Sequence, residues 1–306
     1  MISPFAEQVQ SFFKELQNEI CSALEFTDGK GMFKEDSWSR EGGGGGRTRV
    51  LQDGGIIDKG GVNWSGVHGE LPTNIQKALQ LESKFFFATG VSIVMHPVNP
   101  NVPIIHMNVR YFETRSGKDS NEIQDAWFGG GIDLTPHYII DEDAKWFHSQ
   151  LKKACDKHNL DYYPAHKKWA DDYFFIKHRK ETRGVGGIFF DRLKANSERS
   201  LEDLFAYVRS VGETFAPTYT QLMTKNNSLP YGEKELEWQK IRRGRYVEFN
   251  LVYDKGTKFG LDTDGRIESI LMSLPRMAGW PYDFKPEKES PEAYTLSKLV
   301  KGIDWV

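Results

Sequence analysis

Residues 91–96 read VSIVMH, residues 104–112 read IIHMNVRYF, and residues 127–135 read WFGGGIDLT. Each run alternates between apolar side chains and polar or bare positions, and a period of two is typical of a β-strand. The polar and bare positions are Ser92 and His96 in the first run, His106, Asn108 and Arg110 in the second, and Gly129, Gly131 and Asp133 in the third. We therefore predict three neighbouring strands with one shared polar surface.

This surface differs from an ordinary solvent-facing side of an antiparallel sheet, which is the simplest interpretation of polar alternation. Its residue types are Ser, His, Asn, Arg, Gly and Asp rather than the common Lys, Glu and Thr. Glycines inside a strand often mark a place where a ligand or another backbone comes close. A chain of 306 residues also has room for helices on both sides of a sheet, and a covered polar face needs partners.

Composition limits the function classes. The chain has 40 basic and 43 acidic residues, for a net charge of −3, which argues against a general nucleic-acid or membrane-surface binder. Two cysteines cannot build a disulfide framework and fit a reducing compartment. No apolar run has the length of a membrane span. Because the first helix carries Glu7, Glu15 and Glu19, we expect no transit peptide and a cytoplasmic location.

The rest of the chain alternates between helical and extended patterns. Helices are predicted from Ser3 to about Leu24, from Asp141 to Lys157, from Pro164 to Arg179, after a Ser200–Asp203 capping box, and from Ser290 to Leu299, with a short one over Thr73–Leu81. Further strands are predicted at Gly187–Asp191 and Tyr246–Asp254, with hairpins between Gly54 and Glu70. The pattern indicates an α+β fold in one domain over residues 1–306, with a large antiparallel sheet flanked on both faces by helices.

The run Gly42–Gly46 has two interpretations. It lacks the Gly-Lys-Ser/Thr ending of a phosphate-binding loop, so we interpret it as a flexible connector or as a mobile flap that brings arginines beside a site. Gly184–Gly187 is likewise not a dinucleotide fingerprint, because a charged segment precedes it instead of a buried strand.

Long motifs connect the sequence to a known family. They are EDSWSREGGGGGRTRVL (35–51), GVNWSGVHGE (61–70), GVSIVMHPVNPNVPIIHMNVRYFE (90–113), WFGGGIDLTP (127–136), RGVGGIFFD (183–191), RRGRYVEFNLVYDKGTKFGL (242–261), RIESILMSLP (266–275) and the terminal DWV. Together they resemble oxygen-dependent coproporphyrinogen III oxidase over almost the whole chain. The resemblance implies oxidative decarboxylation of two propionates of coproporphyrinogen III to vinyl groups, giving protoporphyrinogen IX in haem biosynthesis. It also implies a homodimer, with residues from Tyr246 to Pro281 in the interface.

The resemblance assigns roles to individual residues. The substrate-contacting positions that it implies are Ser92, Asn108, Val109, Arg110, Gly129, Gly131, Asp264, Gly265 and Arg266. The catalytic positions are Asp133, His106 and Arg110. Asp264 departs from the family pattern, which commonly has a small residue there, and its carboxylate would repel a propionate. Arg266 is therefore the stronger candidate in that segment.

The residue chemistry agrees with a tetracarboxylate substrate. Arginine binds carboxylates through two parallel bonds, which suits Arg110 and Arg266, and Gly129 and Gly131 leave space for a large ring. We expect no cofactor, because an electron-rich reduced pyrrole can itself donate electrons to oxygen, the co-substrate. In this hypothesis Asp133 lies beneath the pyrrole nitrogens as the base, His106 transfers a proton, and Arg110 holds the departing carboxylate. Ser92 has no activating base and is interpreted as a positioning hydroxyl.

Simpler roles and other classes remain open. Asp133 could cap the turn after its strand, and His106 could merely orient Asn108 or the substrate. An oxygenase with His96, His106 and Asp133 around iron is the main alternative, with His148 and His178 as further metal positions implied by the resemblance. We favour no metal, since these histidines lack compact ligand spacing and His148 and His178 are predicted on helices with surface neighbours. A non-enzymatic porphyrin carrier is the third alternative.

Overall fold

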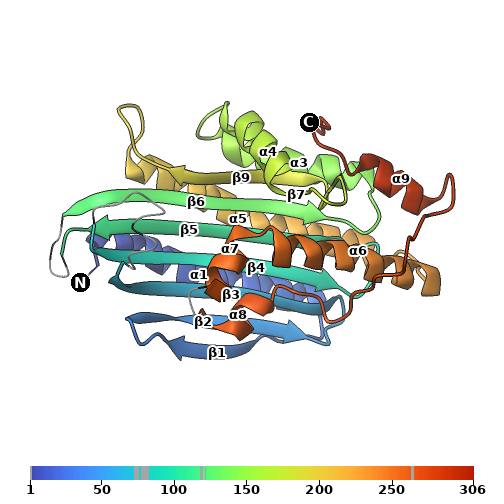
Figure 1. The fold of residues 1–306 in the computed structure, drawn as a ribbon, viewed down its shortest axis with the longest axis horizontal. Helices are drawn as coiled ribbons and strands as arrows, with labels where there is room; N and C mark the ends of the chain where they lie inside the picture. The colour runs from blue at the N-terminus through green and yellow to red at the C-terminus, as the bar shows by residue number, and fades with distance from the viewer. Residues whose placement is uncertain (1, 72–75, 77–82, 118–119, 121, 263–264) are drawn as a thin grey trace.

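A seven-stranded sheet forms the centre of the protein in a computed structural model (Figure 1), and its order is β1-β2-β3-β4-β5-β6-β9 with every pair antiparallel. The structure describes residues 2–71, 76, 83–117, 120, 122–262 and 265–306. The strands are β1 Lys34–Ser39, β2 Gly44–Gln52, β3 Ile57–Glu70, β4 Phe85–Pro97, β5 Ile104–Arg115, β6 Ile123–Thr135 and β9 Gly186–Leu193. A separate small hairpin pairs β7 Phe175–Ile176 with β8 Glu181–Thr182.

Helices cover the sheet on both sides, as predicted (Figure 1). Those described are α1 Pro4–Asp28, α3 Asp141–Asp156, α4 Tyr162–Tyr173, α5 Leu201–Asn226, α6 Glu233–Val252, α7 Lys255–Asp262, α8 Ile267–Leu271 and α9 Pro291–Lys298. In the view of Figure 1, α1 and α5 lie behind the sheet, whereas α6, α7 and α8 lie in front of it. The α+β fold class predicted from the sequence is confirmed.

The main core lies between the sheet and the layer of α1 and α5. Alternation places Val91, Ile93, Met107, Val109 and Tyr111 on this side, and all are buried. Aromatic rings from the helices close the layer: the Phe5 ring meets the Tyr111 ring edge to face at 5.5 Å. Because apolar residues at every second position face this core, the intervening polar residues of β4, β5 and β6 must face α6.

Helix capping explains where several helices begin. The Ser3 hydroxyl accepts the Ala6 amide at 3.0 Å and starts α1, and a complete capping box of Ser200 and Asp203 starts α5. Ser290 caps α9 in the same way. These starts were predicted from the sequence and are confirmed; the Thr73–Leu81 helix lies outside the described residues except at position 76.

The strand predicted at Tyr246–Asp254 is wrong, because these residues belong to α6 and the turn after it. Trp238, Ile241, Tyr246 and Phe249 are spaced as on one helix face and are buried. The glycine at 244 inside this helix has a packing reason. A Cβ there would lie 2.7 Å from the Gly279 carbonyl oxygen, so only glycine lets the two backbones approach.

Three other sequence predictions also need correction. Residues 57–70 form one long strand rather than hairpins, and their glycines face other side chains: a Cβ at Gly60 would lie 2.2 Å from the Met95 sulfur. Gly44 to Gly46 belong to β2, so the run is part of a hairpin and not a connector. The helix predicted to reach Arg179 ends at Tyr173, where the β7–β8 hairpin begins.

Candidate functional site

The antiparallel register brings the predicted polar residues together. Ser92 on β4 pairs with Asn108 on β5, which in turn pairs with Gly131 on β6. Two residues before Asn108 on β5, His106 pairs with Asp133. Two residues from Asn108 in the opposite direction, Arg110 lies opposite Gly129. We call this surface, made of Ser92, His106, Asn108, Arg110, Gly129, Gly131 and Asp133, the polar face. The predicted polar surface is therefore real, and it lies under the layer that contains α6.

Asp133 is the most enclosed side chain of the polar face, with 1% of its surface exposed. Its Oδ1 accepts hydrogen bonds from His106 Nδ1 at 2.8 Å and from Arg183 Nη2 at 2.7 Å. Its Oδ2 accepts from Arg183 Nη2 at 2.8 Å and from Arg183 Nε at 3.2 Å. Both carboxylate oxygens are thus engaged by protein groups, so direct contact with a ligand requires Arg183 or His106 to move.

The electrostatics keep Asp133 ionised. Burial alone would raise the pKa of this carboxyl, but the Arg183 charge and the His106 hydrogen bond outweigh burial and hold the pKa below its usual value. The Asp133 carboxylate is therefore a stable negative charge beside the imidazole rather than a strong base. A carboxylate on Nδ1 fixes the tautomer and the orientation of a histidine.

Arg183 is the main site residue that sequence reasoning missed. Its guanidinium, 2% exposed, lies over three aromatic rings, with its Cζ 4.4 Å from the Phe174 ring centre, 4.8 Å from that of Tyr246 and 4.6 Å from that of Phe249. Its Nη1 donates to Asn250 Oδ1 at 3.0 Å. Residue 183 follows the β7–β8 hairpin, and α6 supplies the residues at 246, 249 and 250. The one available signal was its place at the start of RGVGGIFFD, where no periodicity predicts the direction of the side chain.

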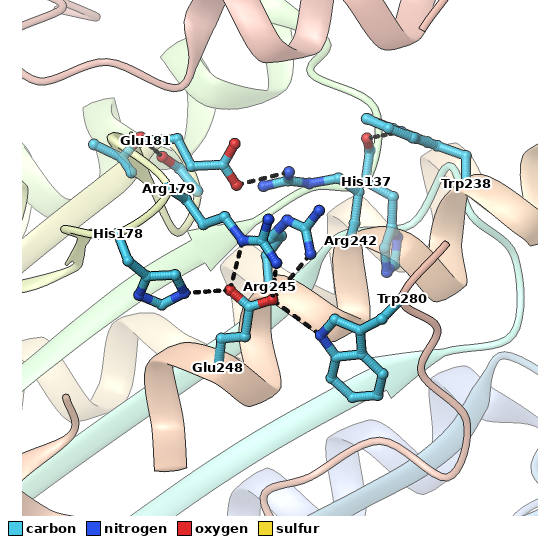
Figure 2. Close-up of polar contacts among 11 residues, drawn as sticks. His137, His178, Arg179, Glu181, Trp238, Arg242, Arg245, Glu248 and Trp280 are labelled. Atoms are coloured by element: carbon cyan, nitrogen blue, oxygen red, sulfur yellow. Dashed lines mark hydrogen bonds and ion pairs between the residues drawn. The ribbon is translucent and has the colours of Figure 1, made fainter. Parts of the chain in front are cut away.

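A second cluster holds the hairpin against the outer side of α6 (Figure 2). The Glu248 carboxylate accepts from Arg179 at 2.7 and 2.9 Å, from Arg245 at 2.9 Å, from His178 at 2.6 Å and from Trp280 Nε1 at 2.9 Å. These bonds outweigh burial and lower the pKa of Glu248 to about 2. The cluster fixes the β7–β8 hairpin on α6. The hairpin places Arg183 beside Asp133, and α6 supplies two of the aromatic rings around Arg183.

His106 and Arg110 are the more accessible groups of the polar face. The His106 side chain is 21% exposed, and because Nδ1 is bonded to Asp133, Nε2 is the nitrogen that can meet a substrate. The Arg110 side chain is 39% exposed. Its Nη1 donates to Asn108 Oδ1 and its Nη2 to Asp191 Oδ1, both at 2.8 Å. These two bonds hold the guanidinium close to Gly129, where an added Cβ would lie 2.8 Å from Nε and Nη2.

The remaining predicted substrate residues are placed differently from one another. The Val109 side chain lies in the core on the far side of the sheet and is fully buried, so only its backbone belongs to the polar side. Arg266 is ion-paired with Asp36 of β1, just before α8. Within α8, Ser269 binds the Thr48 hydroxyl at 2.7 Å and accepts from Asn63 through its carbonyl oxygen at 2.8 Å. Asp264 lies outside the described residues.

Arg266 nevertheless belongs to the same side of the sheet as Ser92. The register forms one row across five strands, namely Asp36, Thr48, Asn63, Ser92 and Asn108. Arg266 contacts the first residue of this row, and Arg110 lies beside the last. The row therefore joins two arginines through small polar side chains.

The histidines of the metal hypothesis are not grouped. His96 is fully buried, with Nε2 at 2.8 Å from the Ser273 carbonyl oxygen. His148 was predicted among surface neighbours but is buried between the Tyr163 hydroxyl and the Val185 carbonyl oxygen. His178 lies in a turn and not on a helix. Over the residues that the structure describes, no group of three His, Cys, Asp or Glu side chains could hold a metal ion.

The predicted flap arginines, Arg47 and Arg49, lie on the other side of the sheet. Arg47 donates to Gln17 Oε1 at 2.6 Å, and Arg49 donates to Asn18 Oδ1 at 2.9 Å, so both contact α1. The interpretation that they flank the site is therefore wrong.

None of the described helices is long and apolar enough to cross a membrane.

Comparison with known proteins identifies the family of the chain. The family model of coproporphyrinogen III oxidase matches residues 8–305. An oxygen-dependent coproporphyrinogen-III oxidase, chloroplastic, of Glycine max is 50% identical over 305 residues, which covers 97% of this chain and 78% of the relative. Coproporphyrinogen-III oxidase 1, chloroplastic, of Arabidopsis thaliana is 47% identical over the same shares of the two chains. The chain belongs to the coproporphyrinogen III oxidase family.

Proposed function

We propose that this protein is an oxidoreductase that uses oxygen to decarboxylate two propionate side chains of coproporphyrinogen III to vinyl groups in haem biosynthesis. Each step converts one propionate and one O₂ into a vinyl group, CO₂ and H₂O₂. The observation that carries the proposal is the alignment of Arg110, Asn108 and His106 along β5, beside Asp133 and the bare glycines of β6, in a chain of this family.

The polar face offers what this substrate needs. Arg110 and Arg266 stand at the two ends of the polar row and carry the forked donors that bind carboxylates. Gly129 and Gly131 let a large ring come close to the strand. The reduced pyrrole supplies the electrons, so we propose that the protein contributes placement, proton transfer and exclusion of water, with oxygen as co-substrate and no cofactor.

We assign proton transfer to His106 and a supporting role to Asp133. Because Arg183 and His106 occupy both oxygens of Asp133, this carboxylate acts through the imidazole instead of touching the pyrrole nitrogens directly. The carboxylate fixes the orientation of the His106 ring, so that Nε2 is the nitrogen that faces a substrate. This assignment replaces the simpler prediction that Asp133 is itself the base.

The activity is tested by incubating the purified protein with coproporphyrinogen III in air and separating the porphyrins after oxidation. The proposal predicts the dicarboxylate product with two H₂O₂ released per molecule. Recovery of the unchanged tetracarboxylate would mean a carrier. The same assay with metal-stripped protein and a chelator addresses the iron alternative: undiminished turnover supports a metal-free reaction, and loss that added iron restores overturns it.

We also propose a homodimer whose interface includes residues from Tyr246 to Pro281. Support comes from the large apolar side chains that this part of the chain leaves at least 40% exposed, which are Leu251, Val252, Leu261, Ile267, Met277 and Trp280, followed by Tyr282 and Phe284. Sedimentation velocity should give a dimer that Ile267→Glu and Met277→Glu dissociate. Phe26→Glu, at an exposed apolar position on α1, is the control that should leave the dimer intact.

For location, the prediction from the acidic first helix is the cytoplasm. The two relatives are named chloroplastic, and a plastid is the competing outcome. A fluorescent fusion to the C-terminus of the natural chain distinguishes a diffuse cytosolic signal from a plastid signal.

A further inference from the structure

Asp191 is a carboxylate beside the polar face to which neither the sequence motifs nor the proposed mechanism gives a role. It lies on β9, and its Oδ1 accepts from Arg110 Nη2 at 2.8 Å. Both side chains are 39% exposed, so the pair is reachable from solvent and from a bound substrate. Asp191 thus occupies Nη2 of Arg110, a donor that a carboxylate bound through two parallel bonds could also use.

The backbone of β9 is shaped to make this contact. Phe128 pairs with Leu193 and Gly130 with Phe190, so two residues, Asp191 and Arg192, lie opposite the single residue Gly129. Such a bulge changes the direction of a side chain relative to a regular strand. Arg192 has a φ of 49°, in the left-handed region that side chains other than glycine adopt at a cost. The strand accepts this conformation at the point where Asp191 turns toward Arg110.

Gly129 provides the space for the pair. A Cβ at this position would lie 2.7 Å from Asp191 Oδ1 and 2.8 Å from Arg110 Nη2, which is too close for either atom to stay in place. The bare position between β5 and β9 is therefore needed for the Arg110–Asp191 contact. Sequence reasoning explained this glycine only by room for the substrate ring.

We propose that Asp191 is an exchange partner for Arg110: it holds the guanidinium between turnovers, gives way to a substrate propionate, and returns when that propionate has become a vinyl group. This inference rests on the proposed function. Asp191 is a positioning residue in this scheme, because it acts on the substrate through Arg110.

Competition between the Asp191 carboxylate and the propionate for Arg110 would help both catalysis and product release. A propionate that binds Arg110 must displace the Asp191 carboxylate, which weakens the ground-state ion pair. Binding the departing carboxylate too tightly would stabilise the substrate relative to the transition state of its loss. The vinyl product carries no charge and cannot pair with Arg110. Asp191 therefore forms its ion pair with Arg110 again, and the product is no longer bound at this end of the polar face.

The test compares Asp191→Asn with the wild type in two measurements, the Kd for coproporphyrinogen III without oxygen and kcat with oxygen. The amide keeps the shape of the side chain but not its charge. We expect the Kd to fall by about twofold to fivefold, the effect of an exposed ion pair, while kcat also falls. Asp191→Glu should restore both values toward wild type. In an Arg110→Ala background, Asp191→Asn should leave the Kd unchanged, because the guanidinium for which Asp191 and the propionate compete is then absent.

Asp125→Asn is the matched control, because it removes a second aspartate that is ion-paired near the same sheet edge, with Lys194 at 2.6 Å. Its Kd and kcat should equal those of the wild type. Equal or weaker binding by a folded Asp191→Asn protein would overturn the proposal, as would an equal gain in Asp125→Asn. Failure of the wild type to decarboxylate the substrate would instead count against the proposed function, since the Kd comparison needs no turnover.

Discussion

The Asp133 carboxylate joins Arg183 to His106: Arg183 Nη2 lies 2.7 Å and His106 Nδ1 lies 2.8 Å from the same oxygen, Oδ1. The Arg183 side chain is buried, whereas His106 reaches the exposed part of the polar face. The buried ion pair of Arg183 and Asp133 therefore fixes the orientation of the accessible His106 imidazole. Arg183 comes from a hairpin and is held by rings on α6, so the position of His106 depends on elements far from β5 in the sequence.

The first prediction concerns the stability of this buried pair. Arg183→Met removes the cation and leaves Asp133 as an uncompensated buried charge, so the free energy of unfolding should fall by about 3–5 kcal/mol. Adding Asp133→Asn should recover a large part of that loss, because the second charge disappears as well. Urea unfolding of the wild type, both single variants and the double variant gives the coupling energy. Additive losses in the double variant would contradict the buried-pair interpretation.

The alternation of β4, β5 and β6 was enough to predict the polar face, because one buried side determines the direction of every second residue. The same rule was misleading at residues 246–254. Apolar and polar residues alternate there in short stretches that fit a strand period of two as well as a helix period of 3.6, and the structure has a helix. Arg183 and Asp191 could not be predicted from periodicity. The β7–β8 hairpin sets the direction of the Arg183 side chain, and the bulge in β9 sets that of Asp191. Both features depend on contacts between segments distant in sequence.

The second prediction uses four buried histidines. Burial lowers the pKa of His137 to about 3 and those of His148 and His166 to about 4, and it lowers that of His96 as well. These values lie below the usual 6.5, so the unfolded chain binds protons that the folded protein does not. Stability should therefore decline as the pH falls from 6.5 toward 4, by up to about 1.4 kcal/mol per pH unit for each histidine.

Urea unfolding at pH 7.5, 6.5 and 5.5 measures this decline. His148→Gln keeps hydrogen-bonding atoms near Tyr163 and removes one titrating group, so its stability should depend less steeply on pH. A free energy of unfolding that stays constant from pH 7.5 to 5.5 would contradict the prediction.

The third prediction concerns the Glu248 cluster. Glu248→Gln keeps the size of the side chain but loses the charge that attracts Arg179, Arg245 and His178, so the hairpin should loosen from α6. We expect a lower melting temperature and faster hydrogen exchange at Arg183 and the hairpin amides, together with reduced kcat. Glu213→Gln on α5 removes an exposed ion pair with Arg209 and is the control that should change none of these three quantities. Wild-type exchange rates in Glu248→Gln would show that the cluster does not hold the hairpin.

The fourth prediction follows from the pKa of the same glutamate. Because it is lowered to about 2, Glu248 stabilises the fold fully above the unfolded value near 4.5, and this contribution is lost as the pH falls from 4.5 through 2. The difference in melting temperature between wild type and Glu248→Gln should be constant from pH 8 to 5 and shrink below pH 4.5. A difference that grows on acidification would have the wrong sign.

The central claim is that Asp133 acts through His106, and kcat in a double-variant cycle tests it most directly. Asp133→Asn and His106→Gln should each lower kcat by about 10²- to 10⁴-fold, with the anaerobic Kd for coproporphyrinogen III close to that of the wild type. The double variant should lose no more than the worse single variant, because the two residues form one unit. Near-normal kcat in folded Asp133→Asn, or losses that multiply in the double variant, would contradict the claim.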